Sequence, residues 1–237
     1  MQKLSDKEKE RYSRHFLIDG FEETHQIKLK NAKVLIIGTG GLGSPVTLYL
    51  TAAGVGTIGI VDNDTVTLSN LQRQVLFSEK DIGKSKIDIA KQRLQGLNSN
   101  TKINSYNIRF AKENAVTIAK NYDLIIDCTD NFETRYLIDE TCKKLNIPFV
   151  YGAIKGFSGQ VSVFNYKTKY SYRDLFPEIP ENSGDVPGVI GTTPAIVGSI
   201  QSAEAIKIIT GTGETLDGKL LVIDSKYNSF EILRLIK

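Results

Sequence analysis

A glycine-rich stretch that follows an apolar run constrains the fold of this chain most strongly. Residues 34–45 read VLIIGTGGLGSP, with Gly38, Gly40 and Gly43 at the spacing G-x-G-x-x-G. The next segment has the apolar period of a helix, and a second unbroken apolar run, TIGIVD, ends at Asp62. A strand, a helix and a strand within about 30 residues predict a βαβ unit, whose crossover is right-handed.

The alternation of helical and apolar segments continues beyond this unit. We expect further helices at 82–97, 112–121 and 135–146, and further strands at 102–109, 123–130 and 147–154. This order is typical of parallel strands wrapped by helices. The sequence therefore predicts an α/β fold with a Rossmann-like, mostly parallel sheet and helices on both faces.

The pattern changes after Gly159. Residues 160–166 alternate apolar and polar side chains, as a half-buried strand does, and a loop that contains Pro and Gly follows over 166–190. The remaining predicted elements are a helix at 193–210 and strands at 219–225 and 230–236. We therefore expect an antiparallel extension at the C-terminal side of the parallel sheet.

The first residues predict a helical arm. Ser5 followed by Glu8 forms a capping box, and the charged segment after it, with Tyr12 and Phe16 interspersed, indicates a helix on the surface. At 237 residues and 41% hydrophobic composition, one domain is long enough to bury a sizeable core. We expect that single domain to have three parts, an N-terminal arm (1–30), a core (31–158) and an antiparallel extension (159–237).

Composition excludes several classes of protein. The 30 basic and 27 acidic residues give a net charge of +3 without a run of five like charges, which argues against a dedicated nucleic-acid binder. No charged leader precedes an apolar stretch and no 18-residue apolar span occurs, so we expect a soluble, cytoplasmic protein. Cys128 and Cys142 are too few for a disulfide framework or a four-cysteine metal site. We place both in the core, and we expect His15 and His25 on the surface.

The glycine loop predicts a phosphate site. Its glycines permit a tight turn and bring backbone N–H groups at a helix N-terminus close to a phosphate. Asp62, at the end of the next strand, stands where a carboxylate accepts hydrogen bonds from ribose hydroxyls. Both features favour a nucleotide, and they leave NAD and ATP open.

Side chains further along the chain favour a triphosphate. The stretch DNDTVTLSNLQRQ brings carboxylates, amides and Arg73 to the mouth of the sheet, where open α/β folds bind ligands. Lys86 lies early in a helix, and Asp130 with Asn131 follows another strand. Cations suit phosphate oxygens and a carboxylate suits magnesium, so this set of residues indicates phosphate chemistry.

Together with RYSRH near the N-terminus, the segments GTGGLGSP, VDNDTVTLSNLQRQ, GKSK and DCTDNFETR resemble the MoeB/ThiF/HesA family, bacterial relatives of ubiquitin-activating enzymes. The resemblance runs from about Leu4 to Phe230. It implies a homodimer that uses ATP and magnesium to adenylate the C-terminal glycine of a small ubiquitin-like sulfur-carrier protein. It also makes the part at 31–158 a nucleotide-binding core.

The resemblance assigns a role to each residue that matches a family motif. The nucleotide-binding residues that it implies are Gly38, Gly40, Gly41, Gly43, Asp62, Asp64, Ser69, Asn70, Arg73, Lys86, Asp130 and Asn131. Asp130 matches the magnesium ligand, and Arg14 resembles the arginine that a neighbouring subunit donates to the triphosphate. The expected catalytic residues are Arg14, Arg73, Lys86 and Asp130.

These residue types fit the chemistry. A C-terminal carboxylate has a pKa of about 3.5, so it is ionised at neutral pH and attacks the α-phosphorus without a general base. The enzyme must supply charge neutralisation and alignment, which Arg14, Arg73, Lys86 and magnesium provide. The absence of a catalytic histidine is consistent with this reaction.

The sequence departs from the family at two places. Many members carry two CxxC pairs that bind structural zinc; here Ser171 and Asp174 replace the cysteines of the first pair, and the chain ends at LRLIK without the second. We therefore expect no zinc. Either ordinary packing recovers the stability that the metal would have given, or the 166–190 loop is mobile. Gly184 stands where some relatives carry a cysteine that links covalently to the carrier or its sulfur. We expect adenylation alone, with a separate sulfur donor.

Several functions stay open at this point. The small subunit of molybdopterin synthase, a MoaD-like carrier, is the favoured substrate, and the ThiS-like carrier of thiamine biosynthesis is the alternative. Activation of a carboxylate on tRNA is disfavoured because no basic patch is evident. An NAD-binding oxidoreductase or redox sensor would have no need of Arg73 or Lys86, and an inactive scaffold would not retain them.

Overall fold

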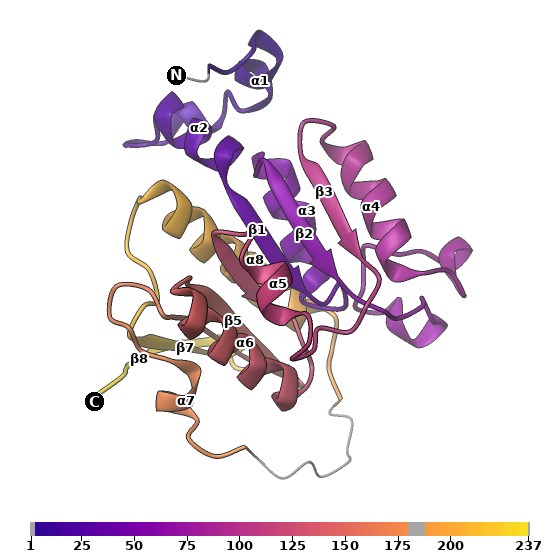
Figure 1. Ribbon diagram of the computed structural model, residues 1–237, viewed down its shortest axis with the longest axis vertical. Coiled ribbons are helices and arrows are strands. Elements are labelled where there is room, and N and C mark those ends of the chain that lie inside the picture. Colours follow the sequence, from indigo (N-terminus) through magenta and orange to yellow (C-terminus); the bar gives the residue numbers. More distant parts are fainter. Residues whose placement is uncertain (1–2, 180–187, 237) are drawn as a thin grey trace.

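Within residues 3–179 and 188–236, which a computed structural model describes, the strands form one eight-stranded sheet in the order β3-β2-β1-β4-β5-β6-β7-β8 (Figure 1). Strands β1 to β5 run parallel, and β6, β7 and β8 join them through antiparallel pairing. The strands are β1 (Lys33–Ile37), β2 (Thr57–Val61), β3 (Lys102–Tyr106), β4 (Leu124–Asp127), β5 (Phe149–Lys155), β6 (Ser158–Phe164), β7 (Lys219–Asp224) and β8 (Ser229–Arg234). The predicted α/β class, with an antiparallel extension, is confirmed.

Strand β1 lies between β2 and β4 in the parallel part of the sheet. Val34 pairs with Ile58 of β2 on one side and with Leu124 of β4 on the other. The side chains from Val34 to Ile37 are at most 3% exposed, because helices cover both faces of the strand. Burial on both faces explains why this strand is an unbroken apolar run instead of an alternating one.

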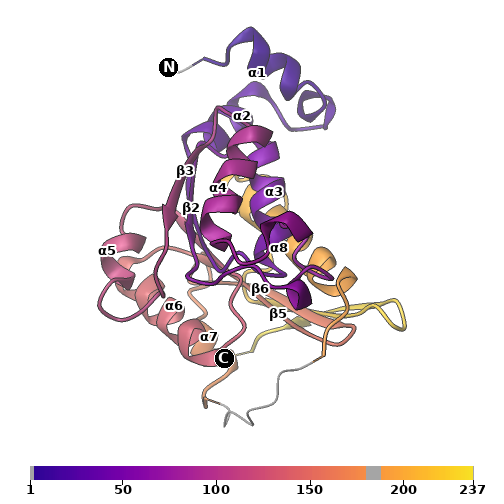
Figure 2. The same ribbon diagram turned by 90° about the vertical axis from the view of Figure 1, so that its right-hand side faces the viewer.

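Helices cover both faces of the sheet, and the sheet divides the hydrophobic core into two layers (Figure 2). Leu50 packs in one layer with Ile36, and Ile138 packs in the other with Leu35. The first face carries α3 (Gly43–Ala53), α4 (Lys86–Leu97) and α8 (Thr192–Thr210), and the second carries α5 (Ala115–Ala119), α6 (Phe132–Leu145) and α7 (Tyr172–Leu175). In the described part of the chain no helix is both long and apolar enough to cross a bilayer.

An N-terminal arm lies at the amino ends of the parallel strands (Figure 1). It contains α1 (Asp6–Arg11), a short 3-10 helix (His15–Leu17) and α2 (Glu23–Asn31). Gln26 of α2 donates from Nε2 to the Ala53 carbonyl at 2.8 Å, at the last residue of α3. The arm therefore lies at the edge of the sheet opposite the carboxyl ends of the strands.

The arm differs from the surface helix that we expected. The capping box of Ser5 and Glu8 is confirmed, but α1 ends at Arg11. Tyr12 is 3% exposed, and its hydroxyl accepts a hydrogen bond from Asn98 Nδ2 at 3.0 Å. The prediction of a surface position was wrong for Tyr12, because the arm packs its aromatic side chains against the ends of α3 and α4. Helix α2 was not predicted, since among its residues only Gln26 and Leu29 are buried.

Several predicted boundaries shift for local reasons. Helix α4 begins at Lys86 and not at residue 82, because Gly83 has a φ of +82° and residue 85 forms an isolated bridge to residue 65. Helix α6 begins at Phe132, three residues before the expected start at 135, because Asn131 caps it. The predicted loop at 166–190 contains the short helix α7, and its segment 180–187 lies outside the described residues.

Candidate functional site

The glycine loop follows β1 and packs tightly against the end of β4. Gly38 has a φ of +94°, and a Cβ on it would lie 2.6 Å from the Cys128 carbonyl oxygen. A Cβ on Gly43 would lie 2.1 Å from the Gly38 carbonyl oxygen, so the first residue of α3 must also lack a side chain. Strand β1 separates β2 from β4, so the loop lies at the point where the strand order reverses, which is the usual ligand site of an open α/β sheet.

Asp62 fixes the shape of this loop. Its Oδ2 accepts hydrogen bonds from the Thr39 backbone N–H at 2.8 Å and from the Thr39 hydroxyl at 2.7 Å. Its Oδ1 accepts from the backbone N–H of Asp64 at 2.9 Å. The carboxylate therefore joins the end of β2 to the loop after β1, and a carboxylate in this position retains lone pairs for ribose hydroxyls.

Lys86 and Asp64 form an ion pair beside the loop. The distance from Lys86 Nζ to Asp64 Oδ2 is 2.8 Å, and Lys86 is 4% exposed. The side chain of Asp64, in contrast, is 64% exposed. The backbone N–H of Lys86 donates to the Asp64 carbonyl at 3.0 Å, which holds the start of α4 against the end of β2. The sequence placed both residues in the site but did not predict that they pair.

Arg73 lies against the glycine loop and the start of α8. A Cβ on Gly41 would be 3.6 Å from Arg73 Cγ and 3.4 Å from Pro194 Cβ. The guanidinium donates from Nη1 to the Ser69 carbonyl at 2.9 Å. Ser69 and Asn70 belong to a 3-10 helix (Leu68–Asn70) that presents Arg73 to the loop, and the Asn70 side chain accepts from the Thr67 backbone N–H.

Helices α3 and α8 both begin at this edge of the sheet. Their N-cap residues are Leu42 and Gly191, and neither makes a side-chain capping hydrogen bond. Gly41 and Pro194 bring the two helix starts together. The N–H groups and positive dipole ends of both helices are thus directed to one place, as in a phosphate-binding site.

Asp130 and Asn131 follow β4 at the same edge. Asn131 is the N-cap of α6, and its Oδ1 accepts from the Thr134 backbone N–H at 2.9 Å. Asn131 Nδ2 lies 3.4 Å from Asp130 Oδ1, and the Asp130 side chain is exposed. The sequence allowed either residue to cap the helix, and the structure shows that Asn131 does so. The Asp130 carboxylate faces solvent beside the loop.

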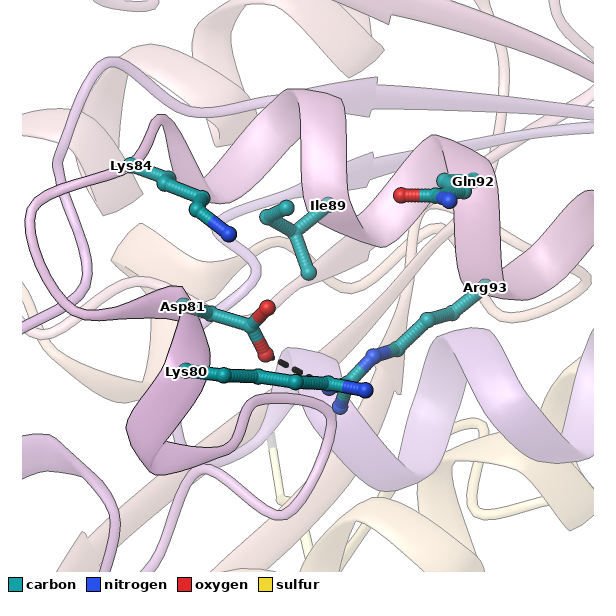
Figure 3. Close-up of a pocket in the computed structure, with 6 residues that line it drawn as sticks. All are labelled: Lys80, Asp81, Lys84, Ile89, Gln92 and Arg93. Carbon is teal, nitrogen blue, oxygen red and sulfur yellow. Dashed lines mark hydrogen bonds and ion pairs between the residues drawn. The ribbon is translucent and has the colours of Figure 1, made fainter.

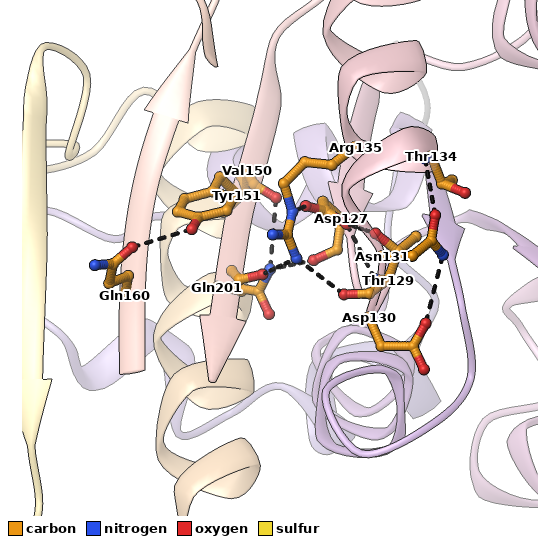
Figure 4. A network of polar contacts seen from close by, with 11 residues as sticks. Asp127, Thr129, Asp130, Asn131, Thr134, Arg135, Val150, Tyr151, Gln160 and Gln201 are labelled. Atoms are coloured by element: carbon orange, nitrogen blue, oxygen red, sulfur yellow. Dashed lines mark hydrogen bonds and ion pairs between the residues drawn. The ribbon is translucent and has the colours of Figure 1, made fainter. Parts of the chain in front are cut away.

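A buried ion pair supports the turn that carries Asp130 (Figure 4). Arg135 Nε lies 2.8 Å from Asp127 Oδ2, and both side chains are at most 7% exposed. Thr129 donates to Asp127 Oδ1 from its backbone N–H at 3.0 Å and from its hydroxyl at 2.6 Å. Arg135 Nη2 donates to the Thr129 carbonyl at 3.1 Å. Burial would lower the pKa of Arg135, but the Asp127 carboxylate more than offsets this and raises it.

Helix α8 contributes to the same network. Gln201 Nε2 donates to the Asp127 carbonyl at 2.7 Å, and Gln201 is fully buried. Asp127 and Arg135 lie in the motif DCTDNFETR, but sequence reasoning gave them no role. Their signal was an acidic residue inside an apolar strand and an arginine on the buried face of an amphipathic helix, which implies a partner.

Arg14 lies far from the loop in the same chain. It is exposed and precedes the 3-10 helix of the arm, which packs beside the C-terminal end of α3. Helix α3 begins at the glycine loop and spans 11 residues, a length of about 16 Å. One chain therefore brings together the loop, Asp62, Arg73, Lys86 and Asp130, but not Arg14.

The two cysteines are buried, and the two histidines are partly exposed. Cys128 and Cys142 are buried, and burial raises the pKa of both thiols well above the ordinary value, so their expected place in the core is confirmed. The histidines are partly exposed, and each also makes a hydrogen bond within the arm. His15 is half-buried and donates from Nδ1 to Gln26 Oε1 at 2.8 Å, and His25 Nδ1 accepts from the Glu22 backbone N–H at 2.9 Å.

Ser171 and Asp174, which replace the first cysteine pair of the family, form the capping box of α7. Ser171 Oγ accepts from the Asp174 backbone N–H at 3.2 Å, and Asp174 Oδ2 accepts from the Ser171 backbone N–H at 2.8 Å. The adjacent Tyr172 is buried, and its backbone N–H donates to Asp139 Oδ1 at 2.9 Å. Gly184, at the place of the covalent cysteine of some relatives, lies outside the described residues.

An open pocket of about 440 Å³ lies elsewhere, beside α4 (Figure 3). A 3-10 helix (Glu79–Asp81) forms one wall, and Asp81 is paired there with Arg93 at 2.5 Å. Its lining residues are Lys80, Asp81, Lys84, Ile89, Gln92 and Arg93. None of the residues predicted for the nucleotide site belongs to it.

Comparison with known proteins identifies the family of this chain. The ThiF family model matches residues 12–237. A probable adenylyltransferase/sulfurtransferase MoeZ of Mycobacterium tuberculosis is 47% identical over 99% of this chain and 62% of that protein. A sulfur carrier protein adenylyltransferase of Thermus thermophilus is 44% identical over 95% of this chain and 87% of that protein. The chain thus spans about three fifths of several relatives that it matches.

Solved structures show the same fold. The crystal structure of E. coli MccB with ATP has a TM-score of 0.86 and 26% identity, and it covers 95% of this chain and 70% of that one. The structure of MccB with MccA-N7isoASN has a TM-score of 0.87 and 25% identity over 98% of this chain and 72% of that one. The resemblance found in the sequence motifs is confirmed: the chain belongs to the ThiF family.

Proposed function

We propose that this protein adenylates the C-terminal glycine of a ubiquitin-like sulfur carrier with ATP and releases pyrophosphate. One observation carries the proposal: Arg73, Lys86 and Asp130 gather around a glycine loop at the reversal point of the sheet. Relatives named sulfur carrier protein adenylyltransferase and molybdopterin-synthase adenylyltransferase support it. The favoured carrier is MoaD-like, in molybdenum cofactor biosynthesis.

The proposed mechanism needs no general base. The carrier carboxylate is ionised at neutral pH, and one of its oxygens forms a bond to the α-phosphorus. The bond from that phosphorus to the bridging oxygen of the β-phosphate breaks, and pyrophosphate leaves with the electron pair. Arg73 and the N–H groups at the starts of α3 and α8 would neutralise the phosphate charge, and Lys86 would be oriented for the same task by Asp64.

Asp130 fits the role of a magnesium ligand. Its carboxylate is exposed at the end of β4, and the contact that the structure gives it, Asn131 Nδ2 at 3.4 Å, involves only Oδ1. Among the described residues no three His, Cys, Asp or Glu side chains gather into a metal-binding group. Magnesium is commonly bound by one or two carboxylates together with substrate phosphates, and there it offsets phosphate charge. Asp130 would supply the protein's share of such a site.

We further propose that the active unit is a homodimer. Arg14 is exposed and separated from the loop of its own chain by the length of α3. An arginine of a second copy could reach the triphosphate where its own cannot. The source of sulfur, in this proposal, is a separate protein.

ATP–pyrophosphate exchange tests the proposed activity. Purified MoaD-like and ThiS-like carriers ending in Gly-Gly are each added to the protein with ATP, magnesium and labelled pyrophosphate. We expect exchange with the MoaD-like carrier and slower exchange with the ThiS-like one. Exchange with neither, together with tight binding of NADH, would contradict the proposal and support an oxidoreductase.

A further inference from the structure

Gln74 carries a buried amide without a partner. The residue is 4% exposed, and its Oε1 has no hydrogen-bond partner. Neither amide atom makes a hydrogen bond to any residue in the described ranges. The backbone around it is well anchored, since Gln74 N–H donates to the Asn70 carbonyl at 2.9 Å and Phe77 N–H donates to the Gln74 carbonyl at 3.0 Å. The side chain is therefore held in place with its hydrogen bonds unmade.

The amide faces the glycine loop. A Cβ built on Gly40 would lie 3.4 Å from Gln74 Nε2 and 3.9 Å from Gln74 Cδ. Because Gly40 has no side chain, nothing of residue 40 stands between the amide and the space above the loop. Arg73, the preceding residue, reaches the adjacent Gly41 in the same way. The consecutive residues Arg73 and Gln74 thus lie beside the positions where Cβ atoms of Gly41 and Gly40 would stand.

Other buried polar atoms without partners differ from this amide. Gln201 Oε1 makes no hydrogen bond, but Gln201 Nε2 donates to the Asp127 carbonyl. Asp139 Oδ2 lies 3.3 Å from Lys143 Nζ in an ion pair, and Asp139 Oδ1 accepts from the Tyr172 backbone N–H. The remaining ones are single hydroxyls, on Thr51, Ser85 and Thr101. Native proteins pair nearly all buried polar groups. A side-chain amide whose buried Oε1 has no partner, and whose Nε2 makes no hydrogen bond to a described residue, therefore indicates a group that a ligand contacts.

We propose that Gln74 binds the α-phosphate of the nucleotide by donating from Nε2 to a non-bridging oxygen, an inference that rests on the proposed function. Thr39, next to Gly40, is hydrogen-bonded to Asp62, the proposed ribose ligand. The α-phosphate is one ester bond from the ribose, so it is the phosphate that reaches Gly40.

The contact would act on the reacting atom. When the carboxylate oxygen adds to the α-phosphorus and pyrophosphate leaves, charge on the non-bridging oxygens must be stabilised. A neutral amide gives a directional hydrogen bond there and keeps its proton throughout. Arg73 and Lys86 supply charge, whereas Gln74 fixes the orientation of the phosphorus.

Nucleotide binding without any carrier tests this inference. The variants are Gln74→Met, which keeps the volume and removes the hydrogen bonds, and Gln74→Glu, which replaces the donor with a negative charge. Gln95→Met, an exposed glutamine of α4, is the matched control. Calorimetric titration with adenosine, AMP and ATP compares ligands that differ only in phosphate groups.

We expect Gln74→Met to weaken AMP and ATP binding about tenfold, the effect of one hydrogen bond, and to leave adenosine binding unchanged. Gln74→Glu should weaken AMP and ATP further, since its carboxylate repels phosphate. Without nucleotide, Gln74→Met should unfold at a temperature equal to or above that of the parent protein, because it removes an unpaired buried amide. In exchange assays its KM for ATP should rise, and its kcat at saturating ATP should also fall.

The result that overturns the inference is equal weakening of adenosine and AMP, which would mean that Gln74 only shapes the loop, or unchanged AMP affinity in both variants. The proposed carrier activity fails in a different way. If the parent protein binds ATP and AMP but exchanges pyrophosphate with no carrier, the activity is contradicted while the Gln74 comparison stands. If the parent binds neither nucleotide, both are overturned.

Discussion

At the scale of single residues, the turn after β4 holds two aspartates with opposite properties. Asp127 is fully buried and paired with Arg135, whereas Asp130 is exposed and contacts only the Asn131 amide among the described residues. Asp127 therefore holds the turn in position, whereas Asp130 has an exposed carboxylate, which we propose binds magnesium. Sequence reasoning selected Asp130 from its motif and passed over Asp127, because nothing local reveals that an arginine eight positions later returns to it.

Asp130→Asn is expected to abolish pyrophosphate exchange and to leave the fold intact. The substitution removes the charge that would hold magnesium, but an exposed side chain contributes about 0.5 kcal/mol or less to stability. The measurements are ATP–pyrophosphate exchange at saturating ATP and a urea unfolding curve. Activity equal to that of the parent protein would remove Asp130 from the metal site.

Asp127→Asn, in contrast to Asp130→Asn, is expected to lower the stability of the fold. It leaves the Arg135 guanidinium buried without its counter-charge, which costs about 3–5 kcal/mol in comparable buried pairs. Its urea midpoint should therefore fall well below that of Asp130→Asn, which serves as the control three residues away. A loss of less than about 1 kcal/mol would show that the pair is not a structural support.

At the scale of elements, short helical segments are fixed by side-chain hydrogen bonds that sequence patterns only partly reveal. The capping box of α1 was predicted from Ser5 and Glu8, but that of α7 was overlooked because the surrounding segment looked like a loop. The 3-10 helix Glu79–Asp81 is similar, since Ser78 and Asp81 close it. The capping of each of these segments depends on one carboxylate or hydroxyl, so a single substitution can test its contribution to stability.

The segment closed by Asp81 should make stability depend on pH. Hydrogen bonds from the Ser78 hydroxyl and backbone N–H, together with the Arg93 charge, lower the pKa of Asp81 below its ordinary value of 3.8. Burial of the carboxylate acts in the opposite direction but is outweighed. A lowered pKa in the folded state means that the carboxylate stabilises the fold above the unfolded-state pKa, and that this contribution is lost as pH falls through the folded-state pKa. Asp81→Asn should therefore destabilise the protein at neutral pH.

The difference between Asp81→Asn and the parent protein should shrink as the pH falls below 3.8 and through the lowered folded-state pKa, because Asp81 then becomes as uncharged as asparagine. Urea unfolding at a series of pH values checks this. A difference that stays constant across the series would show that the charge of Asp81 is irrelevant and that only its shape matters.

At the scale of the whole molecule, the strand order determines where the candidate site lies. The fold places one predicted site residue, Arg14, away from it. The alternation of elements was sufficient to place Gly38, Asp62 and Asp130 at one edge, because carboxyl ends of parallel strands meet there. The same reasoning could not place Arg14, whose arm docks through contacts such as Gln26 to Ala53 that depend on tertiary packing. The pairing of Lys86 with its carboxylate was also beyond the pattern, since it joins segments 22 positions apart.

If Arg14 acts across a homodimer, two inactive variants should complement each other. Arg14→Ala and Asp130→Ala are each expected to lose exchange activity. A mixed dimer would contain one site with both residues intact and one with neither, so random mixing should restore about one quarter of the parent activity. Exchange assays before and after mixing, with subunit exchange followed by a tagged copy, measure this. No recovery in dimers shown to be mixed would contradict action in trans.

Helix α7 begins with the hydroxyl of Ser171 and the carboxylate of Asp174, at positions where the family resemblance led us to expect zinc-binding cysteines in many relatives. Thiolate groups tie the stability of such a segment to metal supply and to the oxidation state of the cell. The hydrogen bonds of Ser171 and Asp174 can be neither extracted by a chelator nor altered by peroxide. The capping of this helix therefore rests on oxygen and backbone N–H groups, which respond to neither agent.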